Sequence, residues 1–586
     1  MDADWRIYSK RADFDAIGNR FNIDPVVARV IRNRDVISED EVERFLYGTL
    51  DSLYPGSLMK DMDKGVGILS RKIDEGVKIR VVGDYDVDGV TATYILYDAL
   101  KNLGADVSYD IPHRITDGYG INVRMIEKAH ADGVDTVITC DNGIAAFDAL
   151  ERGKELGLTI VVTDHHEIQE KLPMADAVID QHQEGDEYPY KEICGAVVAL
   201  KFIRCLYKSR GVELSDRKYL DFAALATVCD VMPLLDENRV IVREGMKQIA
   251  NTDCVGLRAL VNECGLSGSV ISAYHLGFML GPCINTCGRI GAATDALELF
   301  ISDDAEWCRK RAVEIKQNND ERKRITEEGT ALAIEETEKA GRDSDQVIVT
   351  YLNGVHESLA GIIAGKLKEH FYRPTIVFTD SAEPELYKGS GRSIDAYNLF
   401  QELTAVQDIL YKFGGHKLAA GVTIEKKNLE ALREQLNANA HMTEQELIPK
   451  LMIDVPMPLR YVSMDLIRQL DSLEPFGTGN PRPLFAEAGL SLLGMEIFGK
   501  RSNAMKLRVK DSRGGTFILM SFDPDGIVSD IKQWFTDEVC DKILRGIDTG
   551  VKIDVAYQPA INVFNGQSSI QFMLRNMRPN VGDNNG

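Results

Sequence analysis

The chain has 586 residues, of which 44% are hydrophobic and 27% are charged, and its formal net charge at pH 7 is −23. This length exceeds what one hydrophobic core supports, so we expect about three or four compactly folded domains. No apolar segment approaches the roughly 20 residues that a membrane span requires. The polar start MDADWRIYSK also lacks the basic and apolar regions of a signal peptide. These features predict a cytoplasmic protein that does not enter a membrane.

Cysteine spacing and charge distribution narrow the chemistry further. The ten cysteines include no CxxC pair, and the closest two, Cys283 and Cys287, lack a nearby histidine to complete a zinc site. We therefore expect free thiols in a reducing compartment. Basic residues gather at 309–324 and 499–513 although the whole chain is acidic. Such patches are compatible with salt-dependent nucleic-acid binding, but also with an ordinary solvated face.

Residues 1–65 are mixed and favour helices, and no chemistry is visible in them. From residue 66 onward, short apolar runs alternate with segments of helical periodicity. This alternation predicts a parallel sheet covered by helices. The expected strands are 79–82, 136–139 and 159–163, and the expected helices are 90–100, 144–156 and 195–207.

Each of these strands runs directly into an acidic motif. The motifs are GDYDVDG with Asp84, Asp86 and Asp88, CDNG with Asp141, and TDHH with Asp164, His165 and His166. Ligands of an open parallel sheet collect beyond the carboxyl ends of its strands. Carboxylates favour hard divalent cations such as Mg²⁺, and imidazole shifts the preference toward Mn²⁺. One Asp-Gly turn alone could be structural, but the joint pattern indicates a shared two-metal site.

A fourth acidic residue fits this set less directly. Asp230 in CDVMPL ends the helical run 219–229, and Pro233 stops that helix. The carboxylate of Asp230 is therefore either a solvated helix terminus or a side chain directed inward toward the other acids.

The second half begins with a charged, breaker-poor stretch, 306–339, that predicts a long solvent-bridging helix. Residues 345–425 then alternate strands (347–351, 375–378) with a helix (360–368), as in a smaller α/β domain. Its turns GSGRS and GGH would admit phosphate oxygens to backbone N–H groups, although such turns are also common structural elements. The candidate phosphate contacts are Ser390, Arg392, Ser393, Gly415 and His416, and His356 is either a structural or a substrate-binding residue.

Residues 450–578 contain short strands (484–493, 505–509, 517–522, 552–557) separated by polar turns, which predicts a small β-barrel. A barrel with basic and aromatic residues on one face resembles an OB fold, a platform for single-stranded nucleic acid. The aromatic candidate is Phe498, which could instead be core, and the basic candidates are Lys500, Arg501, Lys506 and Arg508. The polar tail 579–586 is expected to be disordered.

The motifs together resemble those of the DHH phosphoesterase superfamily. GDYDVDG, CDNG, DHH and CDVMPL match its four motifs, GPCINTCGRIG (281–291) resembles its GPRINAAGR stretch, and FGGHKLAAG (413–421) resembles the signature of the associated DHHA1 domain. The whole arrangement is similar to the superfamily's single-stranded-DNA-specific exonucleases. The implied domains are an N-terminal helical region (1–65), a DHH catalytic domain (66–255), a helical linker with the long helix (256–340), a DHHA1 domain (341–440) and an OB-like domain (450–578).

The resemblance also implies roles for individual residues. Two divalent cations, Mn²⁺ or Mg²⁺, would be held with Asp141 as the bridging ligand, Asp84 and His166 would lie in the same shell, and Arg289 would contact substrate phosphates. Two positions depart from the family pattern, because Val82 replaces a histidine found in many relatives and Cys283 replaces an arginine. The implied metal ligands are Asp86, Asp88, Asp141, His165 and Asp230.

The function implied is a metal-dependent exonuclease that degrades single-stranded DNA from 5′ to 3′, releases 5′-mononucleotides, and acts in DNA repair and recombination. It would work as a monomer, with a single-strand-binding protein and a helicase as further partners. One alternative is a related phosphodiesterase that cuts short oligoribonucleotides, cyclic dinucleotides or polyphosphate. Another is a non-catalytic, replication-associated single-strand-binding protein. The residues alone do not distinguish polarity, the physiological metal, or DNA from RNA.

Overall fold

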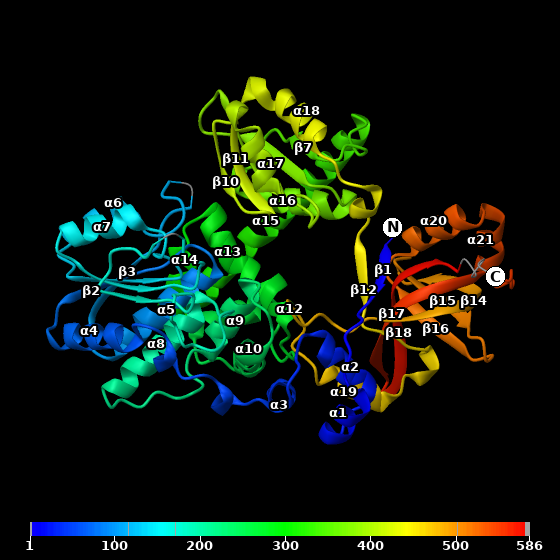
Figure 1. The fold of residues 1–586 in the computed structure, drawn as a ribbon, viewed down its shortest axis with the longest axis horizontal. Helices are drawn as coiled ribbons and strands as arrows, with labels where there is room; N and C mark the ends of the chain where they lie inside the picture. Colours follow the sequence, from blue (N-terminus) through cyan, green and yellow to red (C-terminus); the bar gives the residue numbers. More distant parts are fainter. Residues whose placement is uncertain (1–2, 115, 170, 501, 581–586) are drawn as a thin grey trace. The chain divides into compact units, whose positions relative to one another are not determined.

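A computed structural model describes residues 3–114, 116–169, 171–500 and 502–580, and Figure 1 shows its fold. The chain divides into two compact units. The larger unit contains residues 50–448, and the smaller unit combines residues 1–49 with residues 449–586. The N-terminal residues therefore fold together with the C-terminal part of the chain, and not with the sheet that follows them in sequence.

The larger unit begins with a five-stranded parallel sheet in the order β3-β2-β4-β5-β6. All its neighbouring strands pair in parallel register, and the central residues of β2, β4, β5 and β6 are buried, as expected for a sheet covered on both faces. The expected strands are confirmed. The bounds are β2 (Lys78–Val82), β3 (Asp106–Asp110), β4 (Thr136–Cys140), β5 (Thr159–Thr163) and β6 (Ala177–Ile179).

Helices cover both faces of this sheet, which together with them forms the parallel-sheet lobe (residues 62–209). Successive residues of a strand point to opposite faces, so Ile138 joins one apolar core while Val137 joins the other. On the Ile138 side lie α4 (Met62–Asp74), α5 (Val87–Asn102) and α8 (Gly195–Ser209), and on the Val137 side lie α6 (Val123–Ala131) and α7 (Phe147–Glu155). The loops that follow β2, β4 and β5 consequently meet at one edge of the sheet.

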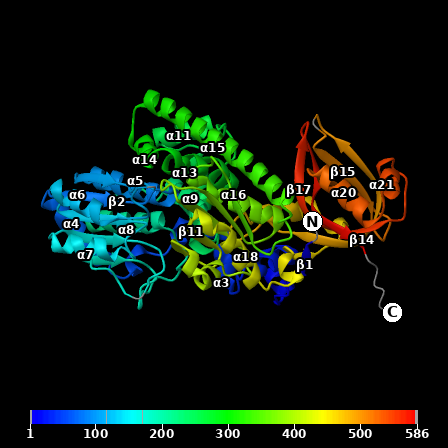
Figure 2. The same ribbon diagram turned by 90° about the horizontal axis from the view of Figure 1, so that it is seen from above.

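A helical segment connects this lobe to the next. Its last helix, α15, has 35 residues and lies beside α11, α13 and α16 in Figure 2. The long helix expected over 306–339 is confirmed, but residues buried every three or four positions, such as Cys308, Ala312 and Ile315, give α15 one packed face, so solvent does not surround it. The helices are α9 (Leu220–Cys229), α10 (Asp236–Ile249), α11 (Val255–Glu263), α12 (Ala273–His275), α13 (Gly281–Ile290), α14 (Thr294–Ile301) and α15 (Ala305–Lys339).

A second, smaller sheet completes the larger unit and forms the mixed-sheet lobe (residues 345–440). Its order is β10-β11-β9-β8-β7, with β7 parallel to β8 and the other pairs antiparallel. The smaller α/β domain expected here is confirmed. Its strands are β7 (Ile348–Tyr351), β8 (Thr375–Asp380), β9 (Leu386–Arg392), β10 (Lys412–Gly415) and β11 (Ala419–Glu425), and its helices are α16 (Glu357–Phe371), α17 (Leu399–Ala405) and α18 (Leu429–Asn439).

The smaller unit contains the expected barrel. Strands run in the order β14-β15-β16-β18-β17, and pairing of β14 with β17 closes the circle. Two helices between β16 and β17 were not foreseen from the sequence. The elements are β13 (Val455–Pro456), β14 (Phe485–Phe498), β15 (Ala504–Lys510), β16 (Thr516–Ser521), α20 (Pro524–Trp534), α21 (Asp537–Leu544), β17 (Lys552–Phe564) and β18 (Gln567–Pro579).

The N-terminal residues pack against this barrel segment through a strand pair and a buried ion pair. Strand β1 (Asp4–Ile7) pairs in parallel with β12 (Lys450–Ile453). Arg34 and Asp454 are almost fully buried, and Arg34 Nη1 lies 2.6 Å from Asp454 Oδ1. The remaining helices are α1 (Phe14–Phe21), α2 (Pro25–Asn33), α3 (Glu39–Tyr47) and α19 (Met464–Asp471). Across the described residues, every helix is too short or too polar to span a lipid bilayer. The tail expected to be disordered lies outside the described residues from position 581 onward.

Candidate active site

The loop after β2 places three aspartates in one tight turn. Asp86 is the N-cap of α5, and its Oδ1 accepts a hydrogen bond from Gly89 N at 3.0 Å. A Cβ at Gly89 would lie 2.5 Å from the backbone oxygen of Asp84, so only glycine fits there. Asp84 is buried and accepts a hydrogen bond from Gly120 N at 3.2 Å.

Asp88 is held by the N-terminus of another helix. Its two carboxylate oxygens accept hydrogen bonds from Gly195 N at 2.7 Å and Ala196 N at 2.8 Å, in the first turn of α8. Unpaired N–H groups and the helix dipole stabilise a negative charge at this position. The buried carboxylate of Asp88 is thereby fixed toward the edge of the sheet.

Asp141 follows β4 in the left-handed conformation, with φ of 59°, and is almost fully buried. Asn142 pins this turn, because its amide nitrogen donates to Val82 O at 3.1 Å and to Cys140 O at 2.8 Å. The side chain of Val82 itself packs in the apolar core beneath α6 and α7 and offers no ligand atom.

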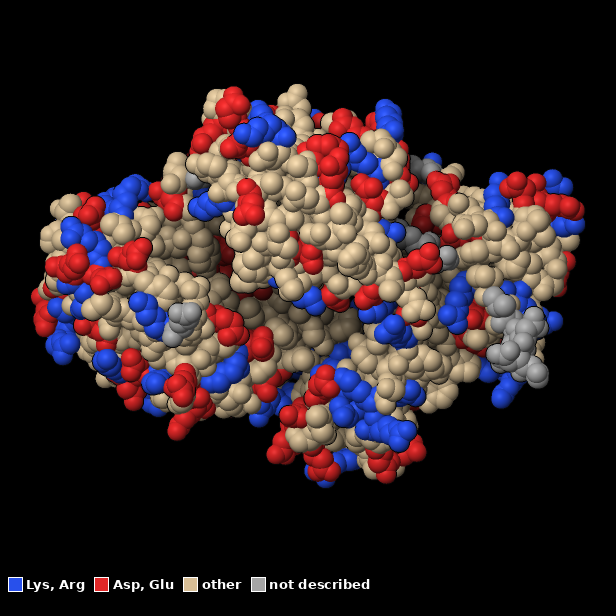
Figure 3. Space-filling view, turned by 45° about the horizontal axis from the view of Figure 1, so that its top comes forward, with Lys and Arg blue, Asp and Glu red and all other residues tan. Residues whose placement is uncertain are grey.

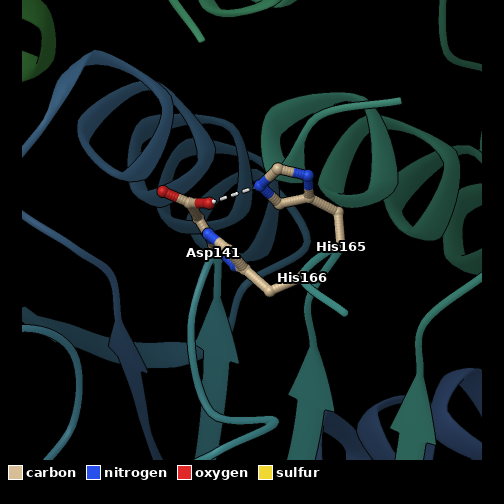
Figure 4. A group of neighbouring side chains, drawn as sticks. All are labelled: Asp141, His165 and His166. Carbon is tan, nitrogen blue, oxygen red and sulfur yellow. Dashed lines mark hydrogen bonds and ion pairs between the residues drawn. The ribbon is translucent and has the colours of Figure 1, made fainter. Parts of the chain in front are cut away.

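The imidazole of His165 is the point at which the acids converge. Its Nε2 lies 3.0 Å from Asp141 Oδ1, 3.5 Å from Asp88 Oδ2 and 3.6 Å from Asp230 Oδ2. Figure 4 shows His165 directed at the Asp141 carboxylate, from the loops that follow neighbouring strands. Asp230 therefore points inward from the end of α9, which settles the alternative that the sequence left open.

Like charges accumulate in this cluster. Burial and the charge of Asp86 raise the pKa of Asp84 to about 7, and burial and the charge of Asp88 raise the pKa of Asp230 to about 8. Asp84 Oδ2 and Asp230 Oδ2 are also buried without a hydrogen-bond partner. Three sets of side chains could each hold an ion with ligand atoms within 4.8 Å of one another: Asp84, Asp86 and Asp141; Asp88, His165 and Asp230; and Asp141, His165 and His166.

These observations fit the binding of divalent cations. Carboxylate oxygens and one imidazole are the donors that Mn²⁺ accepts, and carboxylates alone suit Mg²⁺. Asp141 belongs to two of the three sets, so it lies between two potential ion positions. A cation at each position would neutralise the crowded carboxylates and occupy the unpartnered oxygens of Asp84 and Asp230.

His166 occupies the rim of the cluster and differs electrostatically from His165. Its Nδ1 lies 2.7 Å from Asp164 Oδ1, and the hydroxyl of Tyr119 lies 3.1 Å from its Nε2. Burial lowers the pKa of His166, but the hydrogen bond and charge of Asp164 outweigh it and raise this pKa to about 9. His166 therefore carries a proton at neutral pH. It lines a cavity of about 730 Å³ together with Tyr119, Asp164 and His416.

A second cavity, of about 200 Å³, is cationic. It is lined by Arg114, Arg289 and Arg392 along with Ser390, and none of the three arginines forms an ion pair with a described carboxylate. Burial and the charge of Arg114 lower the pKa of Arg289 to about 10. Arg289 Nη1 donates to Ser358 O at 2.8 Å, so it also connects α13 to α16. Glu357 also lines this cavity, but its carboxylate is paired with Lys388 at 3.0 Å. The three crowded guanidinium groups are therefore suited to a phosphate.

The two charged clusters are neighbours within the larger unit. The Arg114 guanidinium lies 4.8 Å from the centre of the Tyr85 ring, and Tyr85 separates Asp84 from Asp86. Figure 3 shows a hollow between the parallel-sheet lobe at the left and the mixed-sheet lobe at the top, with acidic atoms on its floor. A substrate with one phosphate bound by the arginines could therefore place a neighbouring phosphate at the acidic cluster.

Some expected site residues lie elsewhere or serve the backbone. His356 caps α16, since its Nδ1 accepts a hydrogen bond from Ser358 N. Ser393 is buried and donates to Tyr397 O at 2.7 Å. Gly415 has φ of 149°, and a Cβ there would lie 2.3 Å from Ala419 O. These three residues support turns and helix ends, and none of them lines the arginine cavity.

Two residues of the site were not foreseen from the sequence. Arg114 and Tyr119 belong to the loop after β3, which carries no acidic strand-end motif of the kind used to find the other loops. The sequence feature that could have identified this loop is the Asp-Gly-Tyr-Gly turn at 117–120, which the sequence alone does not distinguish from an ordinary surface turn.

The barrel presents a separate basic surface. Lys506, Arg508 and Lys510 alternate with the buried residues of β15, so their side chains share the outer face. Lys506 Nζ lies 4.8 Å from the centre of the Phe498 ring, and Phe498 is half-buried instead of being part of the core. Lys500 is exposed, whereas Arg501 lies outside the described residues.

Comparisons with known proteins agree with this organisation. Family models match residues 78–227 (DHH family, N-terminal domain), 344–442 (DHHA1 domain) and 453–576 (RecJ OB domain). The single-stranded-DNA-specific exonuclease RecJ of Bacillus subtilis is 32% identical over 97% of this chain and 70% of its own length. The Escherichia coli protein of that name is 31% identical over 95% of this chain and 96% of its own. The crystal structure of RecJ in complex with Mn²⁺ from Thermus thermophilus superposes with a TM-score of 0.81 at 26% identity, covering 98% of this chain and 79% of that one.

Proposed function

The chain belongs to the family of the single-stranded-DNA-specific exonuclease RecJ, and from this we propose that it is a metal-dependent exonuclease that hydrolyses phosphodiester bonds at an end of single-stranded DNA. The observation that carries this proposal is the convergence of Asp88, Asp141 and Asp230 on His165 Nε2. Side chains from four separate segments of the chain would not be buried together with unpaired charge unless a ligand completes the cluster.

We assign the cluster as a two-cation site. Asp84, Asp86 and Asp141 would hold one ion, and Asp88, His165 and Asp230 would hold the other with Asp141 shared between them. Mn²⁺ or Mg²⁺ bound there would supply a nucleophilic water at neutral pH and would offset the charge that develops on the phosphoryl oxygens. No serine or cysteine nucleophile is needed for this chemistry.

The protein groups around this site bind and orient the substrate. Arg289 and Arg392 hold a phosphate of the strand, with the Ser390 hydroxyl beside Arg392 Nη1 at 3.1 Å. His166, protonated through its hydrogen bond to Asp164, places a positive charge at the rim of the acidic cluster, where it attracts a phosphoryl oxygen. Tyr119 fixes this imidazole from the opposite side, and His416 approaches the same cavity from the mixed-sheet lobe.

The surface of the barrel is suited to a long, flexible substrate. Basic side chains on the outer face of β15 follow a phosphate backbone without reading sequence, and Phe498 offers a ring on which a base can stack. A phosphodiesterase for dinucleotides would not require this domain. A non-catalytic binding protein would not require every acidic group of the cluster.

Further properties are proposed from the family resemblance. We place the activity in the 5′ to 3′ direction with release of 5′-mononucleotides, in a monomer that acts in the cytoplasm. A single-strand-binding protein and a helicase would supply the accessible strand. His356, for which the sequence left a structural and a substrate-binding role open, supports the end of α16, and Ser393, a predicted phosphate contact, supports the turn after β9, so both would affect binding only indirectly.

Digestion of end-labelled DNA tests the proposal. Single strands and matched duplexes are incubated with the full chain in Mn²⁺, Mg²⁺ or EDTA, and products are separated by size and by labelled end. We expect mononucleotides from single strands only with a metal, and no product from Asp141→Ala. Asp106→Ala, at an exposed aspartate of the same sheet, is the matched control and retains activity. Binding without cleavage in every metal would refute the enzyme assignment.

A further inference from the structure

Two cysteine thiols from different helices meet behind the active site. Cys264 caps the C-terminus of α11, Cys283 lies in the first turn of α13, and their sulfur atoms are 3.9 Å apart. Cys283 is fully buried, whereas Cys264 retains 8% of its surface exposed. The thiol of Cys287, the nearest cysteine in sequence, instead donates a hydrogen bond to the Cys283 carbonyl oxygen. The spatial partner of Cys283 therefore comes from a different helix.

We propose that Cys264 and Cys283 form a redox-active pair, which a hydroperoxide converts into a disulfide that displaces α13 and reversibly lowers nuclease activity. The effect on activity rests on the function proposed above, whereas formation of the disulfide does not.

The surroundings of the pair favour Cys264 as the thiol that reacts first. The hydrogen bond from Cys283 and the charges of Lys316 and Lys323, on α15, lower the pKa of Cys264, and the same hydrogen bond and burial raise the pKa of Cys283. Asp320 faces the same sulfur and opposes the lysines. Thiolates, and not thiols, attack peroxides, and Cys264 is also the more exposed of the two.

The chemistry proceeds in two balanced steps. The Cys264 thiolate attacks a peroxide oxygen, the O–O bond breaks, and Cys264 becomes a sulfenic acid while the leaving oxygen takes up a proton as water or an alcohol. The Cys283 sulfur then attacks the sulfenic sulfur, the S–O bond breaks, and a second oxygen leaves as water. Overall, two thiols lose two electrons and two protons, and one hydroperoxide is reduced.

A disulfide at this position would act on the active site through α13. The sulfur atoms must approach from 3.9 Å to about 2 Å, and in our proposal α11 and α13 shift toward each other as the disulfide forms. α13 packs closely against the loop after β2, because a Cβ at Gly288 would lie only 2.7 Å from Tyr85 O. Arg289, which lines the arginine cavity, belongs to the same helix. Movement of α13 therefore displaces both the loop next to Asp86 and a phosphate-binding guanidinium.

The experiment treats the purified full-length protein with a small excess of hydrogen peroxide, blocks free thiols by alkylation, and identifies cross-linked peptides by mass spectrometry without reduction. We expect one main linkage, between Cys264 and Cys283, that a dithiol reductant removes. Nuclease activity on labelled single strands should fall by at least about tenfold and recover on reduction, because ångström-scale misplacement of catalytic groups costs up to about 100-fold.

Variants separate this mechanism from general oxidative damage. Cys264→Ser and Cys283→Ser should each keep their activity in peroxide, whereas Cys540→Ser, at a buried cysteine of the smaller unit, should remain as sensitive as the parent protein. Equal sensitivity of all variants, or no linkage between these two residues in the unsubstituted protein, would overturn the proposal. If neither serine variant folds, the linkage and its reversal in the parent protein still decide it. A linkage that forms in a protein without nuclease activity would refute the proposed function alone.

Discussion

The molecule buries charge in two different ways, as matched pairs and as clusters of one sign. In the smaller unit, the Arg34 guanidinium and the Asp454 carboxylate are 2% and 3% exposed and neutralise each other, and Leu484 N and Asn33 complete the hydrogen bonds of Asp454. In the larger unit, the aspartates around His165 and the arginines around Arg289 are each grouped with their own sign.

The difference distinguishes structural charge from functional charge. A matched pair neutralises its own charge, so it needs no outside ligand, and this pair joins residues 1–49 to the barrel segment. Unmatched clusters remain unfavourable until a ligand of opposite sign binds. The acidic cluster favours cations and the neighbouring arginine cluster favours phosphate. The two together therefore indicate metal-dependent chemistry on a phosphate ester more specifically than either cluster would alone.

The largest expected effect concerns the matched pair. Arg34→Ala should destabilise the smaller unit by about 3–5 kcal/mol, because it leaves the Asp454 charge buried and alone. Urea unfolding followed by tryptophan fluorescence in a Trp307→Phe background reports on this unit, since Trp5 and Trp534 both belong to it. The apolar double variant Arg34→Met with Asp454→Leu should recover most of the loss. An unchanged midpoint for Arg34→Ala would show that the pair contributes nothing.

In the acidic cluster, unlike in the matched pair, removal of one charge should stabilise the folded unit when no metal is bound. Asp141→Asn is expected to lower nuclease activity by about 100- to 1,000-fold, as for loss of a group that acts on transition-state charge. In EDTA, however, the larger unit of this variant should unfold at a higher temperature than that of the parent, because one of several repelling carboxylates is gone. Calorimetry with and without Mn²⁺ tests this, and Asp106→Asn is the control. A lower melting temperature in EDTA would mean that these carboxylates do not repel each other.

The same measurement sharpens the cation assignment. Mn²⁺ at about 100 times its dissociation constant should stabilise the parent protein by about 2.7 kcal/mol per site, and Asp141→Asn should lose most of this gain. Stabilisation that is equal in both proteins would place the ion elsewhere.

A smaller effect is expected in the arginine cavity. Arg392→Ala should lower kcat/KM on single-stranded DNA by about 10- to 100-fold, the equivalent of one hydrogen bond to a charged group, chiefly through KM. Arg392→Lys should recover part of the loss, since it restores charge without the planar fork. Arg71→Ala, at an exposed arginine of α4, should behave as the parent protein. A loss confined to kcat with unchanged KM would argue against phosphate binding by Arg392.

The smallest effect concerns the barrel surface, where charge is exposed and screened. Replacing Lys506 and Arg508 by glutamine should reduce the slope of log affinity against log salt by about 0.7 for each lost phosphate contact. Fluorescence anisotropy with a labelled single strand at several salt concentrations measures this slope. Lys532→Gln on α20 is the control, because that lysine is paired with Asp537. An unchanged slope in the double variant would remove β15 from the binding surface.

Much of the acidic cluster was predictable because its residues follow strands. Asp84, Asp141 and His165 each come after a buried apolar run, and parallel strands bring their carboxyl ends to one edge. Asp230 was ambiguous because it ends a helix, and its direction depends on how α9 packs. Arg114 and Tyr119 were missed since their loop follows β3 without a distinctive motif. A substrate role for His356 stays a prediction, since a helix cap and a substrate contact have the same local sequence.

What the sequence determined by itself was the set of elements and the chemistry at their ends, because burial periodicity and strand-end motifs are local properties of the chain. Only the tertiary structure decided which charges are matched. The pairing of Arg34 with Asp454 joins positions 420 residues apart, and the contact of Cys264 with Cys283 depends on the packing of two helices. Such contacts arise from the free energy of packing the whole unit, and no pattern in a short stretch of sequence encodes them.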